Sequence, residues 1–341
     1  MSAAAIATST TVIKASDAGG DLPAKHQPSA PWYVAIGSGL WGSESAFRIP
    51  LTEGGRYGKS GLYASDVLVL IEHVLILITF LPWLWLQRRT WPKRIPLRTL
   101  GYLAISGVAG SAVGTVFFTE ALRTGNPTVV NLLLNVQPVI STFGGWAVHG
   151  ERPNGRFWLW APVALGAGLL LSGDPTHAAG ASWWGISTLY TLLCALAWGA
   201  GTVVGRGAMK ELPVAVASTI RVMVGLVCMA GIVAARGRFD AAHLLPAQAS
   251  AGSWVMLVAL ATVSGGIPLA IYFRGLRGTP ASLAGYFEQM QTLVAVVITW
   301  GVFGHGMDAR QVIAGLVLIG AVTMLQRQGT VDEKGSVKLE A

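Results

Sequence analysis

Residues 74–86 are VLILITFLPWLWL, an uncharged run that does not alternate between apolar and polar side chains. A transmembrane β-strand alternates, whereas a transmembrane helix needs about 20 mostly apolar residues, so this run predicts a membrane helix. The chain contains ten stretches of this kind, bounded by Gly, Pro and charged residues: 32–51, 66–87, 99–121, 127–149, 156–173, 183–204, 213–235, 252–273, 280–303 and 309–326. The sequence therefore predicts an all-α integral membrane protein with ten transmembrane helices.

The composition excludes a soluble globular enzyme. Of the 341 residues, 52% are apolar and 12% are charged, and the mean hydropathy is +0.56; a soluble domain has about 25% charged residues. The net charge of +8 does not indicate a nucleic-acid partner, because Lys and Arg occur in short clusters between apolar runs, as in membrane loops. Cys194 and Cys228 lie in apolar runs without metal-ligand spacing, so we expect no disulfide, metal or cofactor.

The distribution of Lys and Arg predicts the orientation of the chain. With the N-terminus inside, the inner connections and both tails carry 16 of the 24 cations and the outer connections carry 6. Since cytoplasmic loops are enriched in Lys and Arg, we expect a multi-pass protein of the cytoplasmic (inner) membrane with both termini in the cytoplasm. The remaining two cations, Arg48 and Arg221, fall within predicted spans. We interpret residues 1–31 as a disordered cytoplasmic tail and residues 327–341 as a polar C-terminal tail.

The chain also repeats itself. At a constant offset of 154, six residues of the first half have an equivalent in the second half: Leu122/Leu276, Arg123/Arg277, Thr128/Ser282, Gln137/Gln291, Trp146/Trp300 and Gly150/Gly304. Five spans in each half is an odd number, so the second half would enter the membrane from the opposite side. We therefore expect two inverted five-helix repeats, residues 32–173 and 183–326, which is an architecture of alternating-access carriers. A duplication that only enlarges the helical bundle is the alternative.

Short motifs in both halves resemble one transporter superfamily. Residues 114–153 are similar to the third and fourth helices of an EamA-type repeat of the drug/metabolite transporter superfamily, with Ala121-Leu122 before a polar turn, Pro138 in the next helix and Gly150-Glu151 at its end. Trp41-Gly42 and Trp198-Gly199 resemble the first helix of each repeat, and TIRVMVGLV, which contains Arg221, resembles the second helix. The resemblance covers about residues 32–326. It implies a ten-helix carrier, commonly an exporter of amino acids, other metabolites or toxic organic cations.

The chain departs from the superfamily pattern at three places, so the substrate cannot be taken from the resemblance. In the first repeat, Glu72 and His73 lie where the pattern has an arginine, and in the second repeat Thr292 and His305 replace the proline and the glutamate. A carboxyl group surrounded by hydrocarbon takes up and releases protons nearer working pH, so Glu72 is a candidate for proton coupling. The alternative is that Glu72 forms a fixed ion pair with Arg48 or Arg221.

Ionisable groups inside a membrane are costly and are candidates for function. Glu44 and Arg48 lie four residues apart on one predicted helix and are expected to pair. Amides in two other spans would serve to bind a substrate or to join helices. We predict a substrate site from these residues and nearby aromatic side chains: Trp41, Arg48, Glu72, His73, Asn135, Gln137, Trp198, Arg221, Tyr286, Glu288 and Gln291.

Together these patterns predict a secondary active transporter that exports small metabolites, such as amino acids or related compounds, by alternating access. An exporter of toxic organic cations and a facilitative uniporter are the alternatives, since Glu72 and Glu288 favour cations and Arg48 and Arg221 favour a carboxylate. The six His residues are scattered, which argues against an enzyme. The expected partners are a small-molecule substrate, the lipid bilayer and a coupling proton, and a monomer suffices because two repeats can enclose one site.

Overall fold

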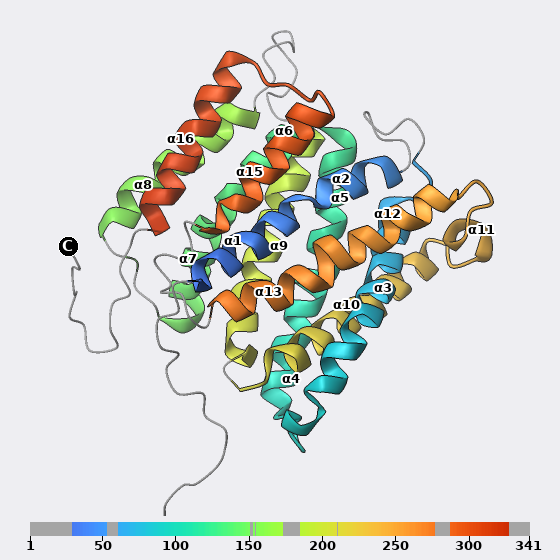
Figure 1. The fold of residues 1–341 in the computed structure, drawn as a ribbon. Coiled ribbons are helices and arrows are strands. Elements are labelled where there is room, and N and C mark those ends of the chain that lie inside the picture. The colour runs from blue at the N-terminus through green and yellow to red at the C-terminus, as the bar shows by residue number, and fades with distance from the viewer. Residues whose placement is uncertain are drawn as a thin grey trace, which may run out of the picture.

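Almost all of the described chain is helical (Figure 1). The computed structural model describes residues 29–52, 61–150, 153, 155–172, 185–209, 211–276 and 287–326. In that part of the chain, one isolated β-bridge joins Thr52 to Tyr63 and no strand is present. The C-terminal tail, most of the predicted N-terminal tail and Tyr286 lie outside the described residues. The predicted helical class is confirmed.

Helices lie on each of the predicted stretches, and several stretches are divided into two or three segments. The α-helices are α1 (Ala30–Gly42), α2 (Glu44–Leu51), α3 (Ser65–Leu86), α4 (Leu97–Ser106), α5 (Gly114–Thr124), α6 (Pro127–Leu133), α7 (Gln137–His149), α8 (Gly155–Ser172), α9 (Ile186–Met209), α10 (Val214–Ala235), α11 (Ala241–Leu244), α12 (Ala251–Ala261), α13 (Ile267–Leu276), α15 (Met290–Val296) and α16 (Ala309–Gln326). The 3₁₀ segments are η1 (Arg88–Thr90) and η3 (Leu134–Val136). The π-helical segments are η2 (Gly107–Val113), η4 (Thr262–Gly266) and η5 (Val297–Val302).

Five helical stretches are long and apolar enough to cross a bilayer: Ser65–Leu86, Leu97–Thr124, Ile186–Gly205, Val214–Ala235 and Ala251–Tyr272. Met290–Val302 and Ala309–Leu325 are shorter apolar helices. Many large apolar side chains lie on the outside of the bundle; Leu86, Val227 and Val302 are each at least 70% exposed. A surface this apolar is stable in lipid and would aggregate in water, so the helices are those of a membrane protein.

Helices from the two halves of the chain pack against each other (Figure 1). Near the start of the chain, α1 lies against α13 and α15, while α3 packs along α10 and α5 along α9. At one end of the molecule α8 and α16 lie side by side, where their buried residues form an apolar core with α6 and α7. The interior is therefore built from both halves.

Two local features interrupt the regular helices or let them approach closely. The chain around Pro138 is not a continuous helix: α6 ends at Leu133, a 3₁₀ turn follows, and α7 begins with Pro138 in its first turn, where a missing N–H costs no hydrogen bond. At a second place, Gly110 of η2 approaches Gly201 of α9 so closely that a Cβ on Gly201 would lie 2.8 Å from the Gly110 Cα. Only residues without side chains allow this crossing.

Candidate substrate-binding site

A polar hollow of about 150 Å³ lies where α6, η3, α7, α9 and α15 meet. The break before Pro138 turns amide side chains toward it from the first half, and the residues before and within α15 line it from the second half. The lining residues are Asn131, Leu134, Asn135, Gln137, Pro138, Trp198, Glu288, Gln289, Gln291, Thr292 and Ala295. Amides, one carboxyl group and one indole ring therefore face a common space.

Two of the amides also join helices. The Asn135 amide donates to the Thr292 hydroxyl over 3.1 Å, which links η3 to α15. The Asn131 amide donates to the Ser45 hydroxyl over 3.0 Å and to the Pro127 carbonyl over 2.8 Å. The helix-joining alternative is present in the geometry, and because the same side chains also line the hollow, substrate binding by them stays a prediction.

Glu288 is held on one side of the hollow by aromatic residues. The Tyr272 hydroxyl donates to the Glu288 carboxylate, and the Tyr272 ring lies against the Trp41 ring with centroids 5.0 Å apart. A phenol donor keeps a carboxylate in place without neutralising its charge. None of the described lining residues is a Lys or Arg, and Glu288 is the acidic side chain among them.

A second polar cluster, formed by Glu44, Arg48 and Glu72, lies between α2, α3 and α5. The Arg48 guanidinium is fully buried; its Nε donates to Glu44 Oε1 over 2.8 Å and its Nη2 donates to Glu72 Oε2 over 2.7 Å. Arg48 Nη1 donates to the Thr119 hydroxyl over 2.9 Å. The predicted pairing of Glu44 with Arg48 is confirmed, and Glu72 is the second counter-ion.

This cluster is connected to the hollow through two aromatic rings. The Arg48 guanidinium carbon lies 5.9 Å from the centroid of the Phe118 ring, and that ring contacts the Trp198 ring with centroids 5.3 Å apart. Trp198 lines the hollow. The Phe118 and Trp198 rings therefore form a continuous packed contact between Arg48 and the hollow.

His73 and Arg221 lie apart from both groups. His73 is buried; its Nδ1 bonds to the Val69 carbonyl over 2.7 Å and its Nε2 to the Ser111 hydroxyl over 2.9 Å. Arg221, one turn before Gly225 on α10, is half-buried beside η2, and no described residue forms an ion pair with it. Arg221 and Glu72 are not paired, and the structure gives Arg48 as the partner of Glu72.

The structure thus divides the predicted site residues into three sets. Asn135, Gln137, Trp198, Glu288 and Gln291 line the hollow, and Trp41 reaches it through Tyr272. Arg48 and Glu72 belong to the charged cluster, and His73 and Arg221 lie beside η2. Tyr286 lies outside the described residues.

Two hydroxyl groups complete these networks without having been predicted. Thr119 accepts a hydrogen bond from Arg48 and Ser111 bonds to His73. Serine and threonine are common in membrane helices, where they usually bond to a carbonyl of their own helix, as Thr119 also does with Thr115. Nothing in the sequence therefore distinguishes these two from the other hydroxyl residues.

Comparison with known families agrees with this arrangement. The model of the EamA-like transporter family matches residues 62–173 and again residues 184–326. The chain belongs to the EamA-like transporter family. The predicted membership is confirmed, and the EamA-like chain is a multi-pass membrane transporter and not an enzyme.

Two curated proteins and one solved structure are similar to this EamA-like chain. The riboflavin transporter ImpX of Fusobacterium nucleatum is 24% identical over 241 residues, which are 69% of this chain and 79% of that protein. A WAT1-related protein of Arabidopsis thaliana is 29% identical over 68 residues, 20% of this chain and 19% of that protein. A crystal structure superposes with a TM-score of 0.57 and 14% identity, covering 87% of this chain and 96% of the other; at this identity the likeness shows the fold alone.

Proposed function

We propose that this chain is a secondary active transporter that exports small metabolites across the cytoplasmic membrane by alternating access. The observation that carries the proposal is the polar hollow enclosed by helices of both halves. Substrate sites of carriers lie between structural repeats, at helices that are interrupted. The break at η3 and Pro138 beside the hollow has this character.

The proposal includes ten transmembrane helices arranged as two inverted repeats, residues 32–173 and 183–326. Three features at equivalent positions support it. Trp146 and Trp300 each accept a backbone bond from a glycine four residues later, Gly150 and Gly304, and these glycines have φ angles of 70° and 71°. The π-helical segments η2 and η4 lie about one repeat apart. The family model also matches the chain twice.

The lining of the hollow supports substrates with hydrogen-bonding groups and an amino or ammonium group. The side chains of Asn135, Gln137 and Gln291 offer both donors and acceptors, while Glu288 offers a negative charge. An amino acid or a related metabolite would place its ammonium group against Glu288, and Trp198 would pack on its apolar part. Arg221 is half-buried beside η2 and has no ion-pair partner among the described residues, so it is the proposed contact for a carboxylate elsewhere on the transport path.

Export of organic cations is the second candidate function, and Glu288 is the observation that favours it. Its carboxylate faces a hollow whose described lining contains no Lys or Arg, while Trp41, Tyr272 and Trp198 lie nearby. A carboxylate beside aromatic faces suits a cation with an apolar body. The two candidates differ in their need for a carboxylate on the substrate, which makes them separable by experiment.

The charged cluster supports proton coupling. Two carboxylates share one guanidinium, so the cluster has one net negative charge when both are ionised. A net charge in hydrocarbon is costly, and one proton on Glu72 or Glu44 removes it while Arg48 keeps a counter-ion. The cluster can therefore exchange one proton per cycle, and a fixed ion-pair role predicts no such exchange.

Flux in proteoliposomes tests the proposal. Purified protein is reconstituted with amino acids, riboflavin or organic cations inside, and efflux is measured with and without an imposed pH gradient. Saturable efflux that increases with the gradient supports a proton-coupled carrier and identifies its substrate class. Saturable efflux that ignores the gradient assigns Glu72 to structure and supports a uniporter, and non-saturable flux contradicts a carrier.

A further inference from the structure

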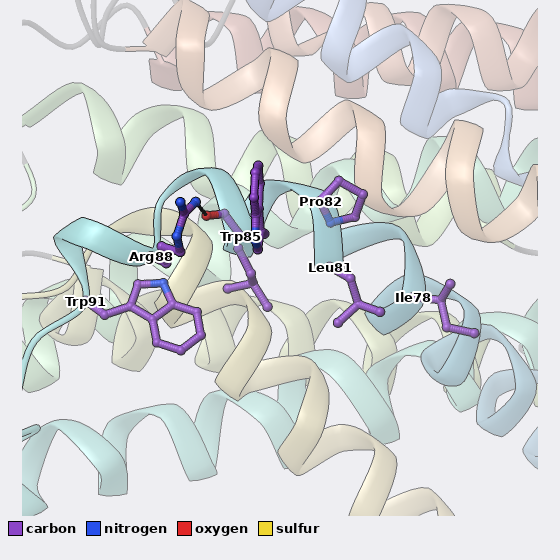
Figure 2. A pocket seen from close by; sticks show the side chains of 7 residues that line it. Ile78, Leu81, Pro82, Trp85, Arg88 and Trp91 are labelled. Carbon is purple, nitrogen blue, oxygen red and sulfur yellow. Dashed lines mark hydrogen bonds between the residues drawn. The ribbon is translucent and has the colours of Figure 1, made fainter.

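A second hollow, of about 790 Å³, lies on the outside of the bundle at the C-terminal end of α3. Figure 2 shows Ile78, Leu81 and Pro82 along the last turns of this helix, with Arg88 and Trp91 beyond them. Unlike the substrate site, this hollow is almost wholly apolar and faces outward: Leu81 and Trp85 are 59% and 63% exposed.

The rim of this hollow has a fixed cation. The Arg88 guanidinium carbon lies 4.2 Å from the centroid of the Trp85 ring, and Arg88 Nη1 donates to the Trp85 carbonyl over 2.9 Å (Figure 2). A guanidinium has five N–H donors, so this contact positions the group and leaves others for a ligand. The fork of the guanidinium suits a phosphate group.

More positive charge follows directly along the chain. Arg89, Lys93, Arg94 and Arg98 are all exposed, and the sequence contains no Asp or Glu between residues 73 and 119. Glu211 reaches this end of the bundle, where it accepts a hydrogen bond from Thr99. Among the residues that the structure describes here, five cations and one carboxylate leave this end strongly positive next to an apolar surface.

We propose that this hollow binds one anionic phospholipid, with an acyl chain against Ile78, Leu81 and Trp85 and the phosphate at Arg88. The ligand must have an apolar part and an anionic part. The boundary between these two parts must lie where α3 leaves the hydrocarbon. An anionic phospholipid has this charge pattern, and basic groups at helix ends select it over neutral lipids. The orientation predicted from the distribution of Lys and Arg would place the site in the inner leaflet.

Lipid binding is measured by native mass spectrometry of the purified full chain, titrated with phosphatidylglycerol or phosphatidylcholine. The wild type is expected to retain one phosphatidylglycerol more tightly than phosphatidylcholine. One cation near a membrane surface changes affinity roughly fivefold, so Arg88→Gln together with Arg89→Gln should weaken phosphatidylglycerol binding roughly 25-fold. Phosphatidylcholine binding should change little.

Arg274→Gln is the matched control, because Arg274 is also an exposed cation over an aromatic ring, 5.4 Å from the centroid of Tyr33, and lines neither hollow. Leu81→Asn tests the apolar part and should weaken both lipids while the cations remain. Equal loss in the double variant and in the control, or no preference of the wild type for phosphatidylglycerol, overturns the proposal. A variant that loses the lipid but gains a dimer peak also overturns it, because a second copy would then cover this surface. The assay does not measure transport, so its outcome is independent of the proposed function.

Discussion

Replacing Glu72 by Gln removes one charge from the Glu44–Arg48–Glu72 cluster while preserving the shape of the side chain. The amide oxygen can still accept the Arg48 Nη2 bond, which is 2.7 Å long in the structure, and Glu44 still neutralises the guanidinium. The cluster then has no net charge and no group that needs a proton. We therefore expect Glu72→Gln to fold, to exchange substrate and to lose coupling to a pH gradient.

The size of the effect follows from one proton per cycle. A gradient of one pH unit supplies about 1.4 kcal/mol for each proton, which supports a concentration ratio of about tenfold for a one-to-one exchange. In proteoliposomes with a gradient of one pH unit, the wild type should reach a steady-state substrate ratio of about ten and Glu72→Gln a ratio of about one. Counterflow exchange without a gradient should persist in both.

Glu120→Gln is the matched control for this experiment. Glu120 also pairs with an arginine, Arg123, over 2.7 Å, but both side chains are partly exposed and neither bonds to Glu44, Arg48 or Glu72. This control should keep the tenfold ratio. A tenfold ratio in Glu72→Gln would refute the reasoning and leave Glu72 as a counter-ion only, while loss of coupling in both variants would show that the assay does not distinguish the two sites.

Four further changes follow from the structure. Arg48→Met leaves two buried carboxylates without a cation and should destabilise the fold by about 3–5 kcal/mol, seen as a lower melting temperature in detergent; an unchanged melting temperature would argue against a charged cluster. Gly201→Leu puts a Cβ 2.8 Å from the backbone of η2 and should cost at least about 1–3 kcal/mol in the same assay, whereas Gly231→Leu, with open space around it, should cost little. Glu288→Gln should raise the half-saturation concentration of cationic substrates about tenfold, a charged hydrogen bond being worth about 1.5–3 kcal/mol, and that of neutral metabolites less than twofold; equal shifts would exclude a charge contact. Arg221→Ala should weaken transport of carboxylates more than of cations, and equal losses would indicate a structural arginine.

The helices could be predicted because lipid leaves the backbone little choice. Each long apolar run must satisfy its own hydrogen bonds, so runs such as residues 66–87 and 213–235 fold as helices close to the predicted bounds, α3 and α10. The interruptions were harder to predict. Pro138 predicts the break beside η3, but the π-helical segments contain no Pro and depend on packing with neighbouring helices, as at Gly110 and Gly201.

The site could be predicted only where contacts are local. Glu44 and Arg48 are one helical turn apart, so their pairing follows from helix geometry. Glu72 bonds to Arg48 from another helix, and Tyr272 and Glu288 lie 16 residues apart in the chain, so neither contact could be predicted from residue spacing. Residue type alone identified Arg221 as unusual, but its place beside η2, away from the hollow, depends on how α10 packs.

Labelling of the polar hollow from both sides of the membrane tests the central claim most directly. Cys194 and Cys228 are replaced by Ala, Gln291→Cys is introduced, and oriented vesicles are treated with a membrane-impermeant maleimide on one face at a time. Alternating access predicts labelling from each face and protection by the transported substrate. Labelling from one face only, with no protection by any substrate that the protein moves, would contradict the account.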